Sequence, residues 1–525
     1  MYARFYRWAF DRLNDNGIIA FITNRSFIDS RTFDGFRQTV QKEFEAAYIV
    51  DTLSDVRVNP KIAGTTHNVF GIQTGVAIMF LIKKQNRENE KCKIHYAVLN
   101  DFWRKEQKLQ WLAENSLKNI PFEIIRPDKN NNWINIADND FESLLSLCSK
   151  NAKLGRGNET LFELYSLGVV TARDEWVYDN NKNLLPNKVN FLIDIYNKDI
   201  LLHKGKDKKE IATSIDYSIK WSRAVKKDLT NGKRYKFTKN DIIECQYRPF
   251  VKKHLYFNRE LNEMQYLLNA IFRGNNISIN FLCVNSSNEL ATLISDKIFD
   301  YCLLKKGNGG TQCLPFYRYD KNGNRIDNIT DWGLQQFVKQ YNDDAITKQD
   351  IFYYVYAVLH NPAYRKKYEL NLKREFPRIP FYDDFYKWVR WGERLMYLHI
   401  DYEKVEPYPL TPSFGHLSPH GEETGVRCKL KANKEAGIII LDEQTELHGV
   451  PSVAWDYKLG NRSALEWILD QYQEKKPKDP TIAEKFNTYR FADYKEQVID
   501  LLKRVCTVSM ETMKIIREME ESYKQ

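Results

Sequence analysis

The chain has 525 residues, and 79 Lys and Arg against 69 Asp and Glu give it a formal net charge of +10. Its length is enough for about three domains with more than one hydrophobic core. No apolar run reaches the roughly 18 residues of a membrane span, and charged residues interrupt the first apolar pattern, which argues against a signal peptide. The eight cysteines are scattered, which argues against a zinc ribbon and a disulfide scaffold. We therefore expect a cytoplasmic protein with no membrane partner.

The first hundred residues predict alternating helices and strands. Residues 2–13 and 32–44 carry apolar side chains at helical spacing. Residues 17–23, 46–53 and 75–84 are continuous apolar runs, which are typical of strands covered on both faces. Short buried strands separated by helices favour part of a doubly wound α/β sheet.

Beyond residue 150 the segments become shorter, more polar and richer in aromatic residues. We predict three parts: an α/β part at 1–150, a mixed α+β part at 151–330, and a helical and C-terminal part at 331–525. Within the last part, we predict helices in residues 330–400, including 352–359, and at 492–521, where apolar side chains recur at helical spacing.

Positive charge is concentrated in one segment. Residues 204–239 hold twelve Lys or Arg and four acidic residues, a net charge of +8, with Tyr217, Trp221, Tyr235 and Phe237 between them. Basic side chains interleaved with aromatic rings suit a nucleic-acid backbone. A solvated surface with a core tryptophan has the same composition, and charge alone does not choose between the two.

Several segments, in order along the chain, carry a family resemblance. NGIIAFITNRSF (16–27), AYIVDTL (47–53) and GVAIMFLIKK (75–84) resemble the later half of an adenine-N6 DNA methyltransferase domain. Later segments resemble the target-recognition region of single-polypeptide (type ISP) restriction–modification enzymes: GVVTARDEW (168–176), YRPFVKKHLYF (247–257), LHNPAYRKKYELNLKREFPRIPF (359–381) and YKLGNRSALEWILDQY (457–472). The resemblance implies a partial class I (Rossmann-like) methyltransferase sheet, followed by a mixed α+β target-recognition region with helical segments.

The same resemblance implies sequence-specific recognition of double-stranded DNA in a restriction–modification system that uses S-adenosylmethionine. Family members bind this cofactor through a glycine-containing loop and act through an Asn/Asp-Pro-Pro-Tyr/Phe motif, and neither occurs at a matching position here. His360-Asn361-Pro362-Ala363-Tyr364 is similar to that motif, but Ala replaces the second Pro, and we predict a turn between two helices. We assign no catalytic residue, and we expect the chain alone neither to bind the cofactor nor to methylate DNA.

Two alternatives stay open. The chain can be a methyltransferase that works only with a partner chain carrying the missing half, together with helicase and nuclease parts. It can also be a degenerate interaction protein that does not bind DNA.

The resemblance places Asn24, Ser26 and Phe27 at the carboxyl end of the first strand, where open α/β sheets bind ligands. We predict that they line the pocket for the target base. The alternative is a strand-to-helix turn in which Asn forms the turn and Ser caps the helix.

For DNA contacts we expect lysines to hold phosphates and arginines to read guanine. The predicted contacts are Arg173, Lys220, Trp221, Arg223, Lys226, Lys227, Arg248, Lys252, Lys253 and Arg462. The alternative is that each is an ordinary surface charge, and that the Arg462 segment is a helix start above a core Trp467. His416 and His420 flank Pro419, so they do not share a helix face, and we predict no metal site.

Overall fold

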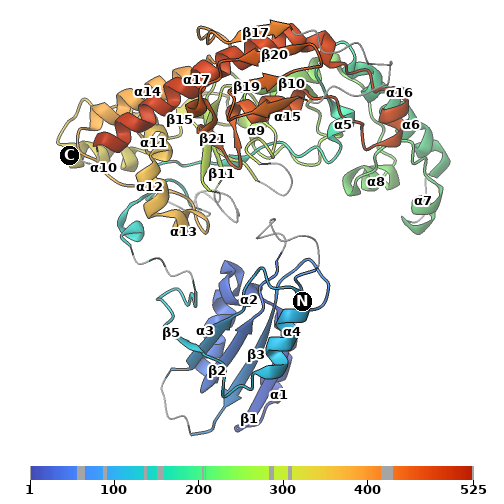
Figure 1. The fold of residues 1–525 in the computed structure, drawn as a ribbon. Helices are drawn as coiled ribbons and strands as arrows, with labels where there is room; N and C mark the ends of the chain where they lie inside the picture. The colour runs from blue at the N-terminus through green and yellow to red at the C-terminus, as the bar shows by residue number, and fades with distance from the viewer. Residues whose placement is uncertain are drawn as a thin grey trace. The chain divides into compact units, whose positions relative to one another are not determined.

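The structure is a computed structural model (Figure 1) that describes residues 2–55, 66–86, 91–134, 137, 139–149, 159–203, 206, 208–282, 289–305, 310–414 and 430–522. The chain divides into two compact units, Met1–Asn139 and Asp140–Gln525, which we call the N-terminal and C-terminal units. The boundary between the units falls between Asn139 and Asp140, whereas the sequence suggests a boundary at residue 150. Residues 140–525, which the sequence suggests dividing near 330, form one unit.

A five-stranded mixed sheet, in the order β1-β3-β2-β4-β5, organises the N-terminal unit. β3 is antiparallel to both β1 and β2, β2 is parallel to β4, and β5 is antiparallel to β4. The strands are β1 Gly17–Asn24, β2 Ala46–Asp51, β3 Val76–Lys83, β4 Lys93–Val98 and β5 Glu123–Ile125, and the helices are α1 Tyr2–Arg12, α2 Ser26–Asp29, α3 Asp34–Glu43 and α4 Lys105–Glu114. The predicted mixture of helices and apolar strands is confirmed.

One face of β1 packs against the aromatic core of this unit. Tyr6 of α1 meets the Phe21 ring edge-on, with ring centroids 5.0 Å apart. On the other face, Ile18 and Ile22 are 66% and 55% exposed. The prediction that this strand is covered on both faces is therefore wrong, because alternate side chains of β1 face the core and the solvent.

The C-terminal unit mixes small antiparallel sheets with a group of long helices (Figure 1). The helices are α5 Asp174–Val177, α6 Leu185–His203, α7 Lys208–Ser214, α8 Arg223–Thr230, α9 Leu268–Ile271, α10 Asp331–Tyr341, α11 Lys348–His360, α12 Pro362–Lys367, α13 Glu369–Leu372, α14 Phe385–Ile400, α15 Ala464–Tyr472, α16 Pro480–Lys485 and α17 Lys495–Ser522. The strands are β6 Leu145–Ser146, β7 Ser166–Leu167, β8 Tyr178–Asp179, β9 Ile242–Arg248, β10 Val251–Tyr256, β11 Ser278–Leu282, β12 Ala291–Ser295, β13 Gln312–Pro315, β14 Tyr317–Tyr319, β15 Arg325–Asp327, β16 Arg378–Ile379, β17 Thr411–Phe414, β18 Lys431–Asn433, β19 Ile438–Ile440, β20 Thr445–His448, β21 Lys458–Leu459 and β22 Arg462–Ser463. The predicted α+β character and the helices at 352–359 and 492–521 are confirmed.

The turn predicted at His360-Asn361-Pro362 is also confirmed. α11 ends at His360, and the Asn361 side chain accepts a hydrogen bond from the Ala363 backbone N–H at 2.9 Å. Pro362 is the first residue of α12, where its missing N–H costs nothing. The likeness to a catalytic motif therefore comes from helix-capping chemistry.

No helix among the residues that the structure describes is long and apolar enough to cross a bilayer. Within the same residues, His, Cys, Asp and Glu side chains do not gather in threes that could hold a metal ion. His416 and His420 lie outside the described residues.

A buried histidine predicts acid sensitivity of the C-terminal unit. His399 contacts the Tyr356 hydroxyl at 2.6 Å and the Thr512 hydroxyl at 2.9 Å, and burial lowers its pKa to about 3. An unfolded histidine titrates near 6.5, so below that pH the unfolded state binds more protons and stability falls as pH falls towards 3. From pH 7 to pH 5 we expect His399 to remove about 2 kcal/mol of stability.

Urea unfolding of the wild type and of His399→Gln at both pH values measures this difference. His448→Gln is the matched control, because the His448 side chain is 40% exposed and contacts only the Glu446 carboxylate, at 3.0 Å, among the described residues. We expect the wild-type pH dependence in the control and a shallower one in His399→Gln. Equal slopes in all three proteins would contradict the assignment.

Candidate nucleic-acid interface

The three residues predicted to line the base pocket form a local turn. Asn24 Oδ1 accepts hydrogen bonds from the Ser26 backbone N–H, at 2.8 Å, and from the Ser26 hydroxyl. Phe27 is fully buried and meets the rings of Tyr6 and Trp133. The geometry matches one half of the alternative, since Asn24 forms the strand-to-helix turn. Ser26 does not cap the helix, because it is the first residue of α2 and Arg25 occupies the N-cap position. The Phe27 ring is enclosed and cannot stack on an extruded base. Contact of Asn24 and Ser26 with a base stays a prediction.

Sequence reasoning missed a buried ion pair beside this turn. Arg25 donates to Asp51 through Nε, at 3.0 Å, and through Nη2, at 2.8 Å, and to Asp29 through Nη1 at 2.8 Å. The Tyr96 hydroxyl donates to Asp51 at 3.0 Å. With these partners satisfied, the cluster fixes the carboxyl end of β1 against that of β2. The signal was an Arg two residues after one apolar run and an Asp inside the next.

In the C-terminal unit, the segment around α8 is anchored by its aromatic residues. The Tyr235 ring stacks on Tyr196 of α6, with centroids 3.8 Å apart and planes at 10°. Trp221 is half-buried, its ring contacts the Tyr196 ring, and its Nε1 donates to the Asp216 carbonyl at 2.8 Å. Ser222 caps α8 by accepting from the Val225 N–H. These contacts hold the basic residues on a fixed support.

The cations of this segment point outward. Six exposed cations form no ion pair within the part of the chain that the structure describes, and we call them the basic surface: Lys220, Arg223, Lys227, Arg234, Lys236 and Lys239. Lys226 lies over the exposed Tyr217 ring, 5.3 Å from its centroid. The basic surface includes three of the predicted DNA contacts and leaves their charge available to a polyanion.

Two predicted DNA contacts lie inside the unit instead. Arg173 is 3% exposed, donates to the Leu261 carbonyl at 2.8 Å and to the Ser222 hydroxyl at 2.6 Å, and burial lowers its pKa. Arg248 is 7% exposed and pairs with Asp300 at 2.8 Å. The sequence prediction treats both as surface groups. Arg173 instead holds the start of α8, and Arg248 neutralises a buried carboxylate.

The remaining predicted contacts are engaged at the surface or partly below it. Lys252 pairs with Glu403 at 2.6 Å. Lys253 lies 4.6 Å from the centroid of the Tyr247 ring, and burial lowers its pKa to about 8.

Arg462 pairs with Asp470 at 2.9 Å and lies over the Trp467 ring. Next to it, Ser463 caps α15, and Trp467 is fully buried, which matches the alternative of a helix start above a core tryptophan. Contact of Arg462 with DNA stays a prediction, as it does for every residue of the basic surface.

Comparison with known proteins now identifies the family. The family model described as "Type ISP C-terminal specificity domain" matches residues 160–501. No curated protein matches the chain.

Three solved structures are similar to the chain over nearly its whole length. A DrdV–DNA complex solved by cryo-electron microscopy is 45% identical, with a TM-score of 0.86, over 99% of this chain and 52% of that one. A nuclease-deletion mutant of the Type ISP restriction–modification enzyme LlaGI, in complex with a DNA substrate mimic, is 31% identical, with a TM-score of 0.79, over 98% and 40%. The ATP-dependent Type ISP restriction–modification enzyme LlaBIII bound to DNA is 30% identical, with a TM-score of 0.82, over 99% and 34%.

The chain thus spans between about a third and a half of the length of these relatives. The matched model covers more than half of the present chain, and it lies within the unit that carries the basic surface. The chain belongs to the Type ISP family and carries its C-terminal specificity domain.

Proposed function

We propose that the C-terminal unit recognises double-stranded DNA for a restriction–modification enzyme, and that the basic surface holds the DNA backbone. The observation that carries this proposal is the group of six exposed cations without ion-pair partners on and around α8, within the described residues. A cation that neutralises a DNA phosphate releases a counterion from the duplex, which favours binding. A cation without an acidic partner does so without first losing an ion pair. The three similar structures, each described as bound to DNA or to a DNA mimic, support the same substrate class.

The test is the salt dependence of binding to a duplex pool, measured by fluorescence anisotropy. Replacing Lys220, Arg223 and Lys227 together by Gln should reduce the slope of log K against log salt by about 2–3, since each lost phosphate contact removes about 0.9. The control replaces Lys321, Lys339 and Lys476 by Gln, three exposed cations elsewhere on the same unit.

The control has the same change in net charge, so a difference between the two triple variants reports contact rather than long-range attraction. Equal slopes would contradict the placement of the interface. Absence of binding by the wild type at low salt would favour the alternative of an interaction protein that does not bind DNA.

The N-terminal unit supports a second proposal, that it is the back half of an adenine-N6 methyltransferase sheet. The supporting observation is its incomplete edge: β1 hydrogen-bonds only to β3 among the described strands, and Ile18 and Ile22 are exposed on it. Phe5 and Trp8 of the adjoining α1 are exposed as well. An apolar edge strand is a pairing site for another strand. We propose that the missing half of the sheet pairs there and brings the cofactor loop and the catalytic motif.

Under this proposal the chain alone does not methylate DNA. A radiolabelled methyl-transfer assay on mixed DNA should give background incorporation with the chain alone, and incorporation should appear when a segment bearing the missing motifs is supplied. Incorporation by the chain alone would contradict the proposal.

A further inference from the structure

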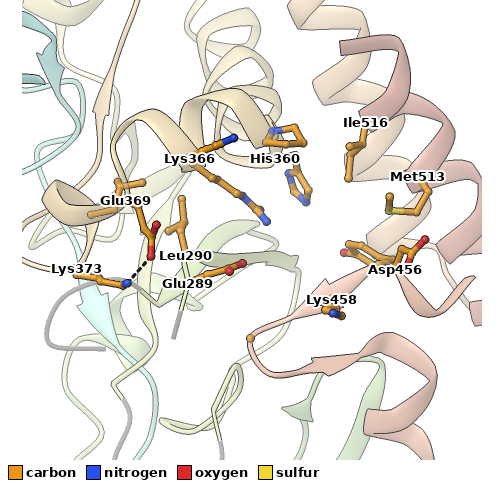
Figure 2. A pocket seen from close by; sticks show the side chains of 15 residues that line it. Glu289, Leu290, His360, Lys366, Glu369, Lys373, Asp456, Lys458, Met513 and Ile516 are labelled. Atoms are coloured by element: carbon orange, nitrogen blue, oxygen red, sulfur yellow. Dashed lines mark hydrogen bonds and ion pairs between the residues drawn. The ribbon is translucent and has the colours of Figure 1, made fainter. Parts of the chain in front are cut away.

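A second binding site is indicated on the C-terminal unit by a cavity of about 410 Å³. It lies where α12 and α13 face α17 and the β21 strand, and we call it the α12–α17 pocket. Figure 2 shows Lys366, Glu369 and Lys373 on one side and Met513 and Ile516 of α17 on another. Its volume lies in the range of small-molecule sites rather than of packing defects.

Two buried side chains of this pocket have polar atoms without hydrogen-bond partners, and a third side chain has a charge without an ion-pair partner. His360 is 1% exposed, and its Nε2 has no hydrogen-bond partner. The Tyr457 hydroxyl is also buried without a partner. Arg365 donates from Nε to the Leu359 carbonyl at 2.7 Å and forms no ion pair with any described residue. Buried polar atoms are nearly always satisfied in proteins, so two such atoms beside a guanidinium without an ion pair in one cavity point to a ligand.

The chemistry of His360 restricts what that ligand can be. Its Nδ1 lies 2.9 Å from the Tyr356 carbonyl oxygen, and only an N–H can approach a carbonyl oxygen this closely. Burial, with the nearby His399 and Arg365, holds the pKa of His360 well below its usual value, so the ring is neutral. With its proton on Nδ1, the ring presents Nε2 as an acceptor. The ligand must therefore bring a hydrogen-bond donor to His360.

Arg365 places a second requirement on the ligand, which must carry a negative charge. Burial lowers its pKa, which records an uncompensated cost of the guanidinium charge, although Tyr457 and Glu289 nearby raise it. An anion accepting from the guanidinium would remove that cost. A carboxylate or a sulfate satisfies Arg365 but has no proton to give to His360 near neutral pH. A phosphate monoester, whose second pKa is about 6, has both a negative charge and an O–H group as its monoanion, and an acceptor facing the O–H favours that form. Inorganic phosphate has both as well.

We propose that the α12–α17 pocket binds a phosphomonoester, with Arg365 and Tyr457 donating to the phosphate oxygens and His360 Nε2 accepting the phosphate O–H. Leu290, Met513 and Ile516 supply apolar surface for the body of the ligand, and the volume admits a group larger than phosphate. A nucleoside monophosphate fits this description. Of the acidic residues that also line the pocket, Glu369 is paired with Lys373.

The site is separate from the proposed DNA contacts of α8 and does not depend on them. A DNA backbone phosphodiester shares the negative charge but lacks the O–H group, so it satisfies Arg365 and Tyr457 without His360. This difference separates the two sources of phosphate experimentally.

Isothermal titration calorimetry of the full chain tests the proposal at about pH 6, where the AMP monoanion is populated. AMP and inorganic phosphate are the probes, and sulfate and adenosine are the controls at matched ionic strength. We expect AMP to bind more tightly than phosphate, and sulfate to bind at least about tenfold more weakly than phosphate. Arg365→Gln should weaken AMP by about tenfold or more. Arg259→Gln, an exposed arginine outside the pocket, should leave AMP binding unchanged.

Two further variants separate binding from folding. Tyr457→Phe keeps the ring that stacks on His399 and removes only the hydroxyl, so it should fold and bind AMP about five- to tenfold more weakly. His360→Phe should abolish the preference for phosphate over sulfate, which a purely structural residue would leave intact.

Three outcomes would overturn the proposal. These are equal affinity for sulfate and phosphate, no binding of either AMP or phosphate by the folded wild type, and unchanged AMP binding in both Arg365→Gln and Tyr457→Phe. If instead a duplex without terminal phosphates binds in a manner that depends on Arg365 and Tyr457 but not on His360, the pocket holds a backbone phosphodiester.

Discussion

Replacing Asp300 by alanine should destabilise the C-terminal unit by about 3–5 kcal/mol. Asp300 is 3% exposed and accepts hydrogen bonds from Arg248 at 2.8 Å, from the Tyr178 hydroxyl at 3.0 Å and from the Cys302 N–H at 2.8 Å. Without the carboxylate, the Arg248 charge stays buried with no counter-charge, and the tyrosine hydroxyl loses its acceptor. Urea unfolding followed by tryptophan fluorescence measures the change.

Asp296→Ala is the matched control, because Asp296 precedes the same turn but lies on the surface, paired with Lys297 at 3.1 Å. An exposed pair of this kind contributes at most about 1 kcal/mol. Equal stability of the two alanine variants would show that the Arg248–Asp300 pair does not support the fold.

Substitution of Arg248 tests whether this residue contacts DNA, as the sequence suggested, or supports the fold. Arg248→Met alone should unfold the unit about as readily as Asp300→Ala, whereas Arg248→Met combined with Asp300→Leu should recover much of the loss, because neither charge is then buried alone. A folded Arg248→Met protein that had lost DNA affinity would instead support a DNA contact.

Arg248 also shows where sequence reasoning ends. The charge of Arg248 and its place in the YRPF segment are visible in the sequence, but its partner Asp300 lies 52 residues further along the chain. Arg173 is similar, because the Leu261 carbonyl that accepts its hydrogen bond lies 88 residues further along. Nothing local distinguishes an arginine that will be buried beside a distant partner from one that will stay in solvent. The basic residues around α8 were easier, because their number exceeds that of the acidic residues that could neutralise them.

The fold, too, has features that local sequence predicts and features that depend on distant contacts. Continuous apolar runs identified β1, β2 and β3, and helical spacing identified α1, α3 and α17, because periodicity is a local property. The exposure of Ile18 and Ile22 could not be predicted, since it depends on what covers the sheet rather than on the strand itself. The α12–α17 pocket also depends on distant contacts. The sequence predicts the turn after His360, whereas the tertiary fold brings His360 and Tyr457 to one cavity.

Substituting Gly392 by alanine should cost the C-terminal unit about 3 kcal/mol or more, through the contact between α11 and α14. A Cβ atom on Gly392 would lie 1.9 Å from the Tyr353 carbonyl oxygen and 2.5 Å from its carbon. These are backbone atoms of α11, and Phe352, Tyr354 and Val355 beside them are fully buried, so the helix cannot yield locally. The two helices would have to separate, which outweighs the roughly 1 kcal/mol that alanine gains over glycine in a helix.

Gly35→Ala in α3 is the control for this substitution, because nothing lies within 4 Å of the added Cβ and we expect no loss, or a gain of up to about 1 kcal/mol. Thermal and urea unfolding of both variants measure the difference. Separation of α11 from α14 would also pull Tyr356 away from its hydrogen bond to His399 and displace His360 at the end of α11. A folded Gly392→Ala protein should therefore lose AMP affinity in the α12–α17 pocket while Gly35→Ala retains it, and wild-type stability in Gly392→Ala would show that the helices do not pack this closely in solution.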